Sequence, residues 1–172
     1  MSHNNRKFDK ESYKANDQKA KDAMSNYLYQ QGYSDIEQRE DYFFDISAKL
    51  YHVDGSCKNY FFEVEIKNQW SNIWPSSWKE VRIPERKQRL INKWKKEFKD
   101  HELIFVVFNT DCSKAWFMDG DLVGESTIGK IQNSTRIGEP HLQEPFFHIP
   151  YPEAELINIL EREYLRTLHY VN

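Results

Sequence analysis

This sequence lacks the features of a membrane protein, a secreted scaffold or a zinc protein. No segment approaches the roughly 18 consecutive apolar residues that a membrane-spanning helix needs, and the mean hydropathy is -0.85. The two cysteines, Cys57 and Cys112, match no metal-binding pattern, and the 6 histidines show no ligand spacing. Residues 1–14 lack the apolar segment of a signal peptide, so we expect an intracellular, cytoplasmic location.

The chain is rich in charge, and the charge is unevenly distributed. Charged residues make up 30% of the sequence and the formal net charge is -3, yet residues 78–100 hold nine Lys or Arg against four Asp or Glu. A basic segment within an acidic chain is typical of proteins that bind an anionic partner at one face. A solvated helix surface would have the same composition, so charge alone leaves both interpretations open.

Hydrophobic periodicity predicts helices alternating with strands. Ala20, Met24 and Leu28 recur at helical spacing before Gly32, which ends the first helix. The expected order is a helix at 9–31, hairpin strands at 42–53 and 59–70, a helix at 84–99 with Pro84 in its first turn, strands at 102–109, 114–120 and 145–149, and a last helix from Pro152 that uses Leu156, Leu160, Tyr164 and Leu168.

This order predicts an α/β fold with a central mixed β-sheet flanked by helices. At 172 residues the chain is long enough for one domain with its own hydrophobic core. We therefore expect a single domain over residues 1–172, with the core at about 9–119 and an extension that includes the C-terminal helix at about 120–172.

The strand at 59–70 places charged side chains in an apolar context. Side chains alternate between the two faces of a strand, so Phe62 and Val64 point one way while Glu63, Glu65 and Lys67 point the other. Two carboxylates and an ammonium on one face form either an ion-pair cluster or a site for a metal ion and a phosphate.

A second acid, Asp45, lies between Phe44 and Ile46 on the preceding strand. A charge in such a place is costly unless it is paired or bound to a metal. Magnesium prefers oxygen ligands and usually takes one or two carboxylates besides water and phosphate oxygens. Asp45 and Glu65 on neighbouring strands would supply such a pair, and Lys67 would reach the same space.

This pattern of an acid on one strand and Glu65-Ile66-Lys67 on the next, between a first helix and a basic helix, resembles the PD-(D/E)xK nuclease superfamily. That superfamily includes restriction endonucleases and archaeal Holliday-junction resolvases. The resemblance covers about residues 9–119 and implies a restriction-endonuclease-like core. It implies that Asp45, Glu65 and the main-chain carbonyl of Ile66 bind Mg²⁺ or Mn²⁺. It also implies that Lys67 assists the attacking water or the transition state of phosphodiester hydrolysis.

Some positions depart from the superfamily pattern. Phe44 stands where many members have proline, and Lys21 stands where many carry an acid on the first helix. Asp17, one turn earlier on the same helix face, is a candidate catalytic replacement, although a helix cap or a solvated residue is an equal interpretation. Glu63 is an additional acid on the site face, either an auxiliary catalytic residue or a partner for Lys67.

The basic segment provides candidate contacts to a nucleic-acid backbone. The residues that we expect to make them are Arg82, Arg86, Lys87, Arg89 and Lys93. Phosphate contacts of this kind hold the substrate in register without reading its sequence. Trp74 lies in the tryptophan-rich loop at 70–78, where stacking on bases is one interpretation and packing of the loop against the domain is the other.

Together these features predict a metal-dependent nuclease that acts on DNA in preference to RNA, with Mg²⁺ or Mn²⁺ as cofactor and no membrane partner. Nucleases that cut both strands often dimerise, so a homodimer is one arrangement. Two other classes remain open. One is a catalytically inactive nucleic-acid-binding module on the same fold. The other is a protein-interaction or inhibitor protein in which the charged face is an ion-pair cluster.

Overall fold

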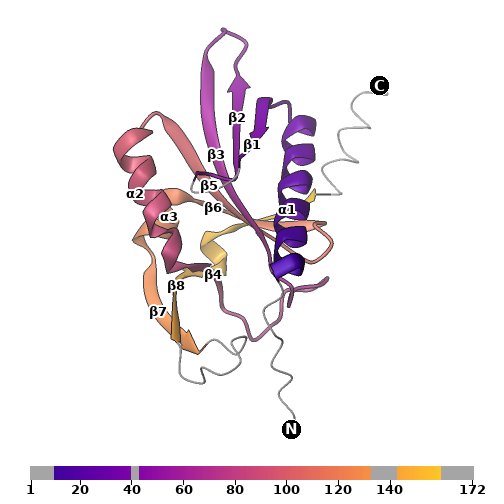
Figure 1. Ribbon diagram of the computed structural model, residues 1–172, viewed down its shortest axis with the longest axis vertical. Coiled ribbons are helices and arrows are strands. Elements are labelled where there is room, and N and C mark those ends of the chain that lie inside the picture. Colours follow the sequence, from indigo (N-terminus) through magenta and orange to yellow (C-terminus); the bar gives the residue numbers. More distant parts are fainter. Residues whose placement is uncertain (1–9, 40–42, 133–142, 160–172) are drawn as a thin grey trace.

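A computed structural model describes residues 10–39, 43–132 and 143–159, which form two β-sheets and three α-helices (Figure 1). The helices are α1 (Lys10–Gln30), α2 (Gln88–Glu97) and α3 (Gly120–Glu125), with 3-10 turns η1 (Glu85–Lys87) and η2 (Tyr151–Glu153). The strands are β1 (Ser34–Gln38), β2 (Ile46–Tyr51), β3 (Cys57–Ile66), β4 (Glu80–Pro84), β5 (His101–Phe108), β6 (Lys114–Asp119), β7 (Thr127–Gln132), β8 (Gln143–Pro150) and β9 (Glu155–Asn158). None of the helices in these ranges is long and apolar enough to cross a membrane.

The larger sheet has six strands in the order β1-β2-β3-β5-β6-β9. Its central pair, β3 and β5, is parallel, and its other pairs are antiparallel. The smaller sheet has the order β4-β8-β7 and is antiparallel. The expected α/β class and the mixed central sheet are confirmed.

Both faces of the larger sheet are covered, as is usual around parallel strands. Figure 1 shows α1 on one side, and α2, α3 and the smaller sheet on the other. Met24 and Leu28 of α1 are buried with Phe62 of β3 on the first side. Leu90 and Ile91 of α2 are buried in a second core on the opposite side. The charged face of β3 therefore looks into the molecule, because a second sheet that the sequence pattern did not predict covers it.

The hairpin expected around Asp54–Ser56 is confirmed. Tyr51 pairs with Cys57, and the side chain of Asp54 accepts hydrogen bonds from the backbone N–H and the hydroxyl of Ser56. Gly55 adopts a φ of +85°, in the left-handed region that favours glycine. The turn thus determines the register that brings the far ends of β2 and β3 together.

Two of the expected element boundaries were wrong. Pro84 ends β4 instead of opening a helix, because β4 pairs with β8 and the helix follows only at Gln88. The last helix does not begin at Pro152, since residues 155–158 form β9 beside β6. The expected helical positions from Leu160 onward lie outside the described residues.

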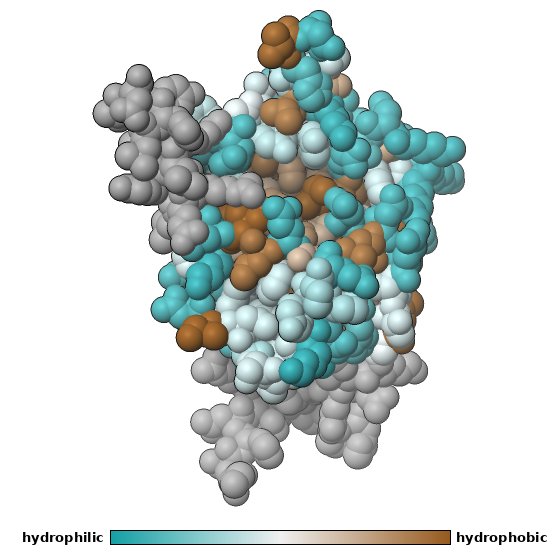
Figure 2. All heavy atoms as spheres, turned by 180° about the vertical axis from the view of Figure 1, so that it is seen from behind, coloured by the Kyte–Doolittle hydropathy of each residue, from teal (hydrophilic) through white to brown (hydrophobic). Residues whose placement is uncertain are grey.

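The molecule also has an open groove of about 560 Å³ beside the C-terminal end of α1, lined partly by Tyr33, Tyr60 and Ile157. The pKa of Tyr33 is raised to about 12, because burial and the neighbouring Tyr60 disfavour its charged form. In the view from behind, Figure 2 shows hydrophobic side chains near the middle of that face, among hydrophilic ones.

Candidate active site

The site forms where β2 and β3 stop pairing. Regular pairing between these strands reaches Ile46 opposite Phe62. Just beyond it, the backbone N–H of Val64 donates a 2.9 Å hydrogen bond to Oδ2 of Asp45. In return, the backbone N–H of Asp45 donates a 3.0 Å hydrogen bond to Oε2 of Glu63. Two carboxylates replace backbone partners here, which holds both acids at the end of the hairpin.

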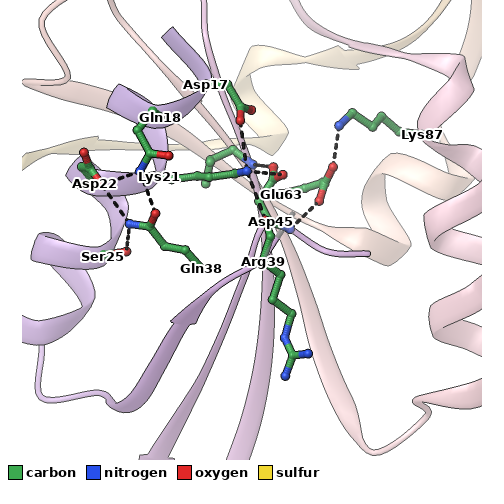
Figure 3. Close-up of polar contacts among 11 residues, drawn as sticks. Asp17, Gln18, Lys21, Asp22, Ser25, Gln38, Arg39, Asp45, Glu63 and Lys87 are labelled. Atoms are coloured by element: carbon green, nitrogen blue, oxygen red, sulfur yellow. Dashed lines mark hydrogen bonds and ion pairs between the residues drawn. The ribbon is translucent and has the colours of Figure 1, made fainter. Parts of the chain in front are cut away.

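Glu63 is almost completely buried, with 4% of its surface exposed. Its second carboxylate oxygen, Oε1, forms an ion pair and hydrogen bond with Nζ of Lys87, which reaches in from η1 (Figure 3). Burial alone would lower the pKa of Lys87, but the carboxylates of Glu63 and Asp45 outweigh it and raise the pKa. Because both oxygens of Glu63 are engaged, its main role is to hold Asp45 and Lys87.

Lys21 approaches the same acids from the opposite side, on α1 (Figure 3). Its Nζ lies 3.0 Å from Oδ2 of Asp17, 3.1 Å from the backbone oxygen of Arg39 and 3.8 Å from Oδ1 of Asp45. Asp17 therefore joins the site through Lys21 and not by contact with Asp45. Asp22 forms hydrogen bonds with Gln18 and Gln38 instead, on another part of the helix surface.

Glu65 differs from Glu63 because it has no direct partner among the described residues. It is half-buried and makes no hydrogen bond or ion pair with any of the described residues. Burial raises the pKa of its carboxyl group, and the charges of Lys87, Lys67 and Arg86 only partly oppose that effect. The charge of Asp45 adds to the rise, so the two acids lie close enough to repel each other.

Asp45 is the second acid of the site with a perturbed pKa. Its pKa is raised to about 7, mainly because burial removes water from the carboxylate and secondly because the negative charge of Glu63 lies nearby. The positive charges of Lys87 and Lys21 oppose the rise without cancelling it. The site thus contains more buried negative charge than its own lysines neutralise.

Lys67 follows β3, and its backbone N–H donates a 2.9 Å hydrogen bond to the carbonyl oxygen of Phe108. Its Nζ lies 5.3 Å from the centre of the Trp78 ring, a cation–π distance. Burial lowers the pKa of the Lys67 ammonium, whereas the charge of Glu65 works in the opposite direction. In the part of the chain that the structure describes, Lys67 is not in an ion pair, so its charge is available to a ligand.

These residues meet the basic requirements for one divalent cation. Asp45 directly precedes β2 and Glu65 lies on the neighbouring strand β3, and among the described residues Oδ1 of Asp45 has only a 3.8 Å contact with Lys21. One or two carboxylates are the usual protein contribution to a magnesium site. A small cavity beside them is lined by Glu63, Glu65 and Lys87 among other residues. The described residues contain no group of three acidic, histidine or cysteine side chains arranged for a metal, so water and substrate oxygens would have to complete the coordination.

The expected nucleic-acid contacts separate into inward and outward groups. Lys87 points inward to Glu63, while Arg86 and Arg89, before and at the start of α2, are exposed. Arg82 lies on β4, where its Nε is 3.2 Å from Oε1 of Glu80, and its charge also acts on Lys67. Lys93 is placed differently, with Nζ 3.9 Å from Oε2 of Glu97 and 5.2 Å from the ring of Phe43.

The tryptophan loop packs against the domain, as one of the two interpretations predicted, because Trp70 is buried in the core and the ring of Trp74 lies 5.5 Å from that of Trp116 on β6. Trp74 meets the rings of Trp70 and Trp78 edge-on at 5.1 and 4.9 Å, and its Nε1–H donates to the backbone oxygen of Trp78. Trp74 is half-buried, and stacking on bases remains a prediction for its exposed part. The cluster does have a consequence for the site, since it presents the face of Trp78 to Lys67.

Two contributions were missed in the sequence pattern. Lys87 was assigned to an external phosphate contact, and Trp78 was not connected to Lys67. The only signal for Lys87 was its place in the basic segment, which does not indicate its direction. That direction is determined by η1, a turn at which the chain leaves β4.

No protein-family model matches this chain, and a comparison with curated proteins finds no match either.

Proposed function

We propose that this chain is a metal-dependent nuclease of the PD-(D/E)xK type that hydrolyses phosphodiester bonds in DNA. The observation that carries the proposal is the meeting of Asp45 and Glu65, two acids with raised pKa values, where the charges of Lys67 and Lys87 also act. Buried acids perturbed in this way are typical of functional sites. A restriction-endonuclease-like core, with β2, β3 and β5 as its central strands, is part of the proposal.

In this proposal Asp45, Glu65 and the carbonyl oxygen of Ile66 hold Mg²⁺ or Mn²⁺. Such an ion supplies positive charge for the phosphate oxygens and lowers the pKa of a bound water. Nζ of Lys67 donates a hydrogen bond to the attacking water or to a phosphate oxygen, and thereby stabilises the charge that develops on the phosphate. The lowered pKa of Lys67 suits that role, as does the absence of an ion pair with any residue that the structure describes.

In this proposal, exposed basic residues near the site bind the DNA backbone. Arg86 is exposed on η1 and its charge reaches Glu65, while Arg89 lies one turn further along α2. Both would attract phosphate groups toward the acids, in a manner that depends on salt and not on sequence. Lys87, held by Glu63, would add positive charge at the scissile phosphate.

A second candidate function is a nucleic-acid-binding module on the same fold that does not cleave. The observation that favours it is the extent of internal neutralisation, because Lys87 pairs with Glu63 and Lys21 pairs with Asp17. If these pairs persist in the presence of metal and DNA, the acids would stabilise the fold and would not bind a cation.

Cleavage assays separate the two. Plasmid, linear duplex and single-stranded DNA should be cut in Mn²⁺ or Mg²⁺ but not in EDTA, and Lys67→Ala should lower the rate by about 100-fold or more. Lys79→Ala is the matched control, since Lys79 is exposed on the same segment and donates to the backbone oxygen of Ser76. Absence of cutting in folded wild-type protein, with salt-sensitive DNA binding retained, would favour the binding module. Absence of both would favour an interaction protein.

A further inference from the structure

Oxygen atoms lie around Nζ of Lys21, as they would around a bound cation. Only 6% of its surface is exposed, and its Nζ lies among oxygens of Asp17, Arg39 and Asp45 at 3.0, 3.1 and 3.8 Å. These oxygens come from α1, from the backbone after β1 and from the residue before β2, so the ammonium joins three separate segments. A metal ion could link three such segments, and in this protein the ammonium group of Lys21 links them.

The charges around Lys21 limit what else the site can accept. Its acids are Asp17, Asp45, Glu63 and Glu65. Its cationic groups are the ammoniums of Lys21, Lys67 and Lys87 and the guanidinium of Arg86, whose charge acts on Glu65. Four carboxylates and four cationic groups give a formal balance of zero. One divalent ion would leave two positive charges beside an anionic phosphodiester, whereas two divalent ions would leave four in a partly buried space, which is costly.

We infer that the site takes one divalent cation and that Lys21 is the built-in counter-charge on its α1 side. This inference rests on the proposed nuclease function, because that function requires the cation. The ion would bind Glu65 together with Asp45, since the Glu65 carboxylate has no partner among the described residues. Lys21 acts on the reaction only through Asp45 and is therefore a positioning residue.

Displacement of Lys21 by a second ion is unfavourable. An ammonium has three N–H donors, and the largely buried Nζ of Lys21 lies within hydrogen-bond distance of Oδ2 of Asp17 and the backbone oxygen of Arg39. A metal entering between Asp17 and Asp45 would leave this charge buried without its partners, which is strongly unfavourable. Lys87 approaches from the other side of the acids, where it pairs with Glu63, and does not compete for the oxygens of Asp17 (Figure 3).

The number of ions bound per chain tests this inference. Free Mn²⁺ can be measured by electron paramagnetic resonance during titration of the full chain, without DNA. We expect one Mn²⁺ per wild-type chain and one per chain in Lys21→Arg, which retains the charge. Lys21→Glu places a third carboxylate beside Asp17 and Asp45, so it should bind two. Circular dichroism and thermal unfolding would confirm that each variant is folded.

Each result has a distinct meaning. Two ions per wild-type chain would overturn the role of Lys21 while leaving the proposed nuclease intact. No bound ion in folded wild-type protein would overturn the proposed function, and this inference with it. A folded Lys21→Glu variant that still binds one ion would also overturn the role of Lys21. If that variant does not fold, the wild-type and Lys21→Arg counts still decide.

Discussion

Acids at two places in this protein have pKa values shifted in opposite directions, although positive charges lie near both. On the smaller sheet, Oε1 of Glu80 lies 2.5 Å from Nδ1 of His148 and 3.2 Å from Nε of Arg82. Burial raises the pKa of Glu80, but the hydrogen bonds from His148 and Arg82 outweigh it, so the net shift is downward. At the end of β2 and β3, burial dominates instead and raises the pKa values of Asp45 and Glu65.

The difference distinguishes an acid that stabilises the fold from the acid that we propose as a metal ligand. Glu80 has direct hydrogen-bond donors that favour its charged form, so its negative charge contributes to folding. Glu65 is near several positive charges but is bound directly to none of the described residues. A fold that leaves buried charge under-compensated loses stability there, which is typical of sites where a ligand completes the interactions.

Substitution of one acid from each group should give the largest contrast. Glu65→Gln removes a proposed metal ligand, so we expect DNA cleavage to fall about 1000-fold. Glu80→Gln changes charge by the same amount outside the site, and its rate should remain within about threefold of wild type. Initial rates of plasmid nicking in Mn²⁺ measure both. Equal losses in the two variants would mean that Glu65 has no special role.

Loss of Lys87 should lower the free energy of unfolding, because it leaves the buried carboxylate of Glu63 without its counter-charge. Lys87→Met leaves Glu63 without its ion-pair partner, and breaking a buried pair in this way costs about 3 kcal/mol of unfolding free energy. The double variant Glu63→Gln, Lys87→Met should recover part of that loss, because no unpaired charge remains. Urea unfolding measures the effect, with Lys79→Met as the surface control. A loss below about 0.5 kcal/mol would argue that Lys87 is not a buried partner.

Metal binding should stabilise the folded chain, because the cation would compensate the negative charges of Asp45 and Glu65. At Mn²⁺ concentrations 100-fold above Kd, linkage gives about 2.7 kcal/mol of additional stability. In a protein of this size that corresponds to an increase in Tm of about 5–10 °C. Thermal unfolding with and without Mn²⁺ should show the increase in wild type and in Glu80→Gln but not in Glu65→Gln. An increase that persists in Glu65→Gln would place the ion elsewhere.

The smallest expected effect is the pH dependence of the structural acid. Because the folded pKa of Glu80 lies below its ordinary value of 4.5, the unfolded chain binds the proton more tightly. Its contribution is therefore complete above about pH 5 and is lost as the pH falls through the folded pKa. We expect wild type to lose about 1 kcal/mol more than Glu80→Gln between pH 5 and pH 3. Parallel Tm curves for the two proteins would contradict this.

Local patterns in the chain predicted the parts of the fold that depend on local physics. The spacing of Ala20, Met24 and Leu28 indicated α1, and alternation around Phe62 indicated β3 and its two faces. The strand β4 was not predicted, because its short alternation at Val81–Ile83 is followed directly by a basic helix. Its strand character depends on pairing with β8, more than 60 residues away in the chain. Likewise, β9 is a strand because β6 offers an open edge.

The candidate site divides in the same way. Asp45, Glu65 and Lys67 were identifiable because a charge in an apolar strand is a local anomaly with a physical cost. Whether Lys87 faces a phosphate or Glu63, and whether Lys21 joins Asp17 to Asp45, depends on how η1 and α1 pack over the sheet. Periodicity along the chain determines which face of a strand or helix a side chain occupies. The partners of that side chain are decided only when distant segments pack together, because electrostatic interactions and burial depend on distances in space.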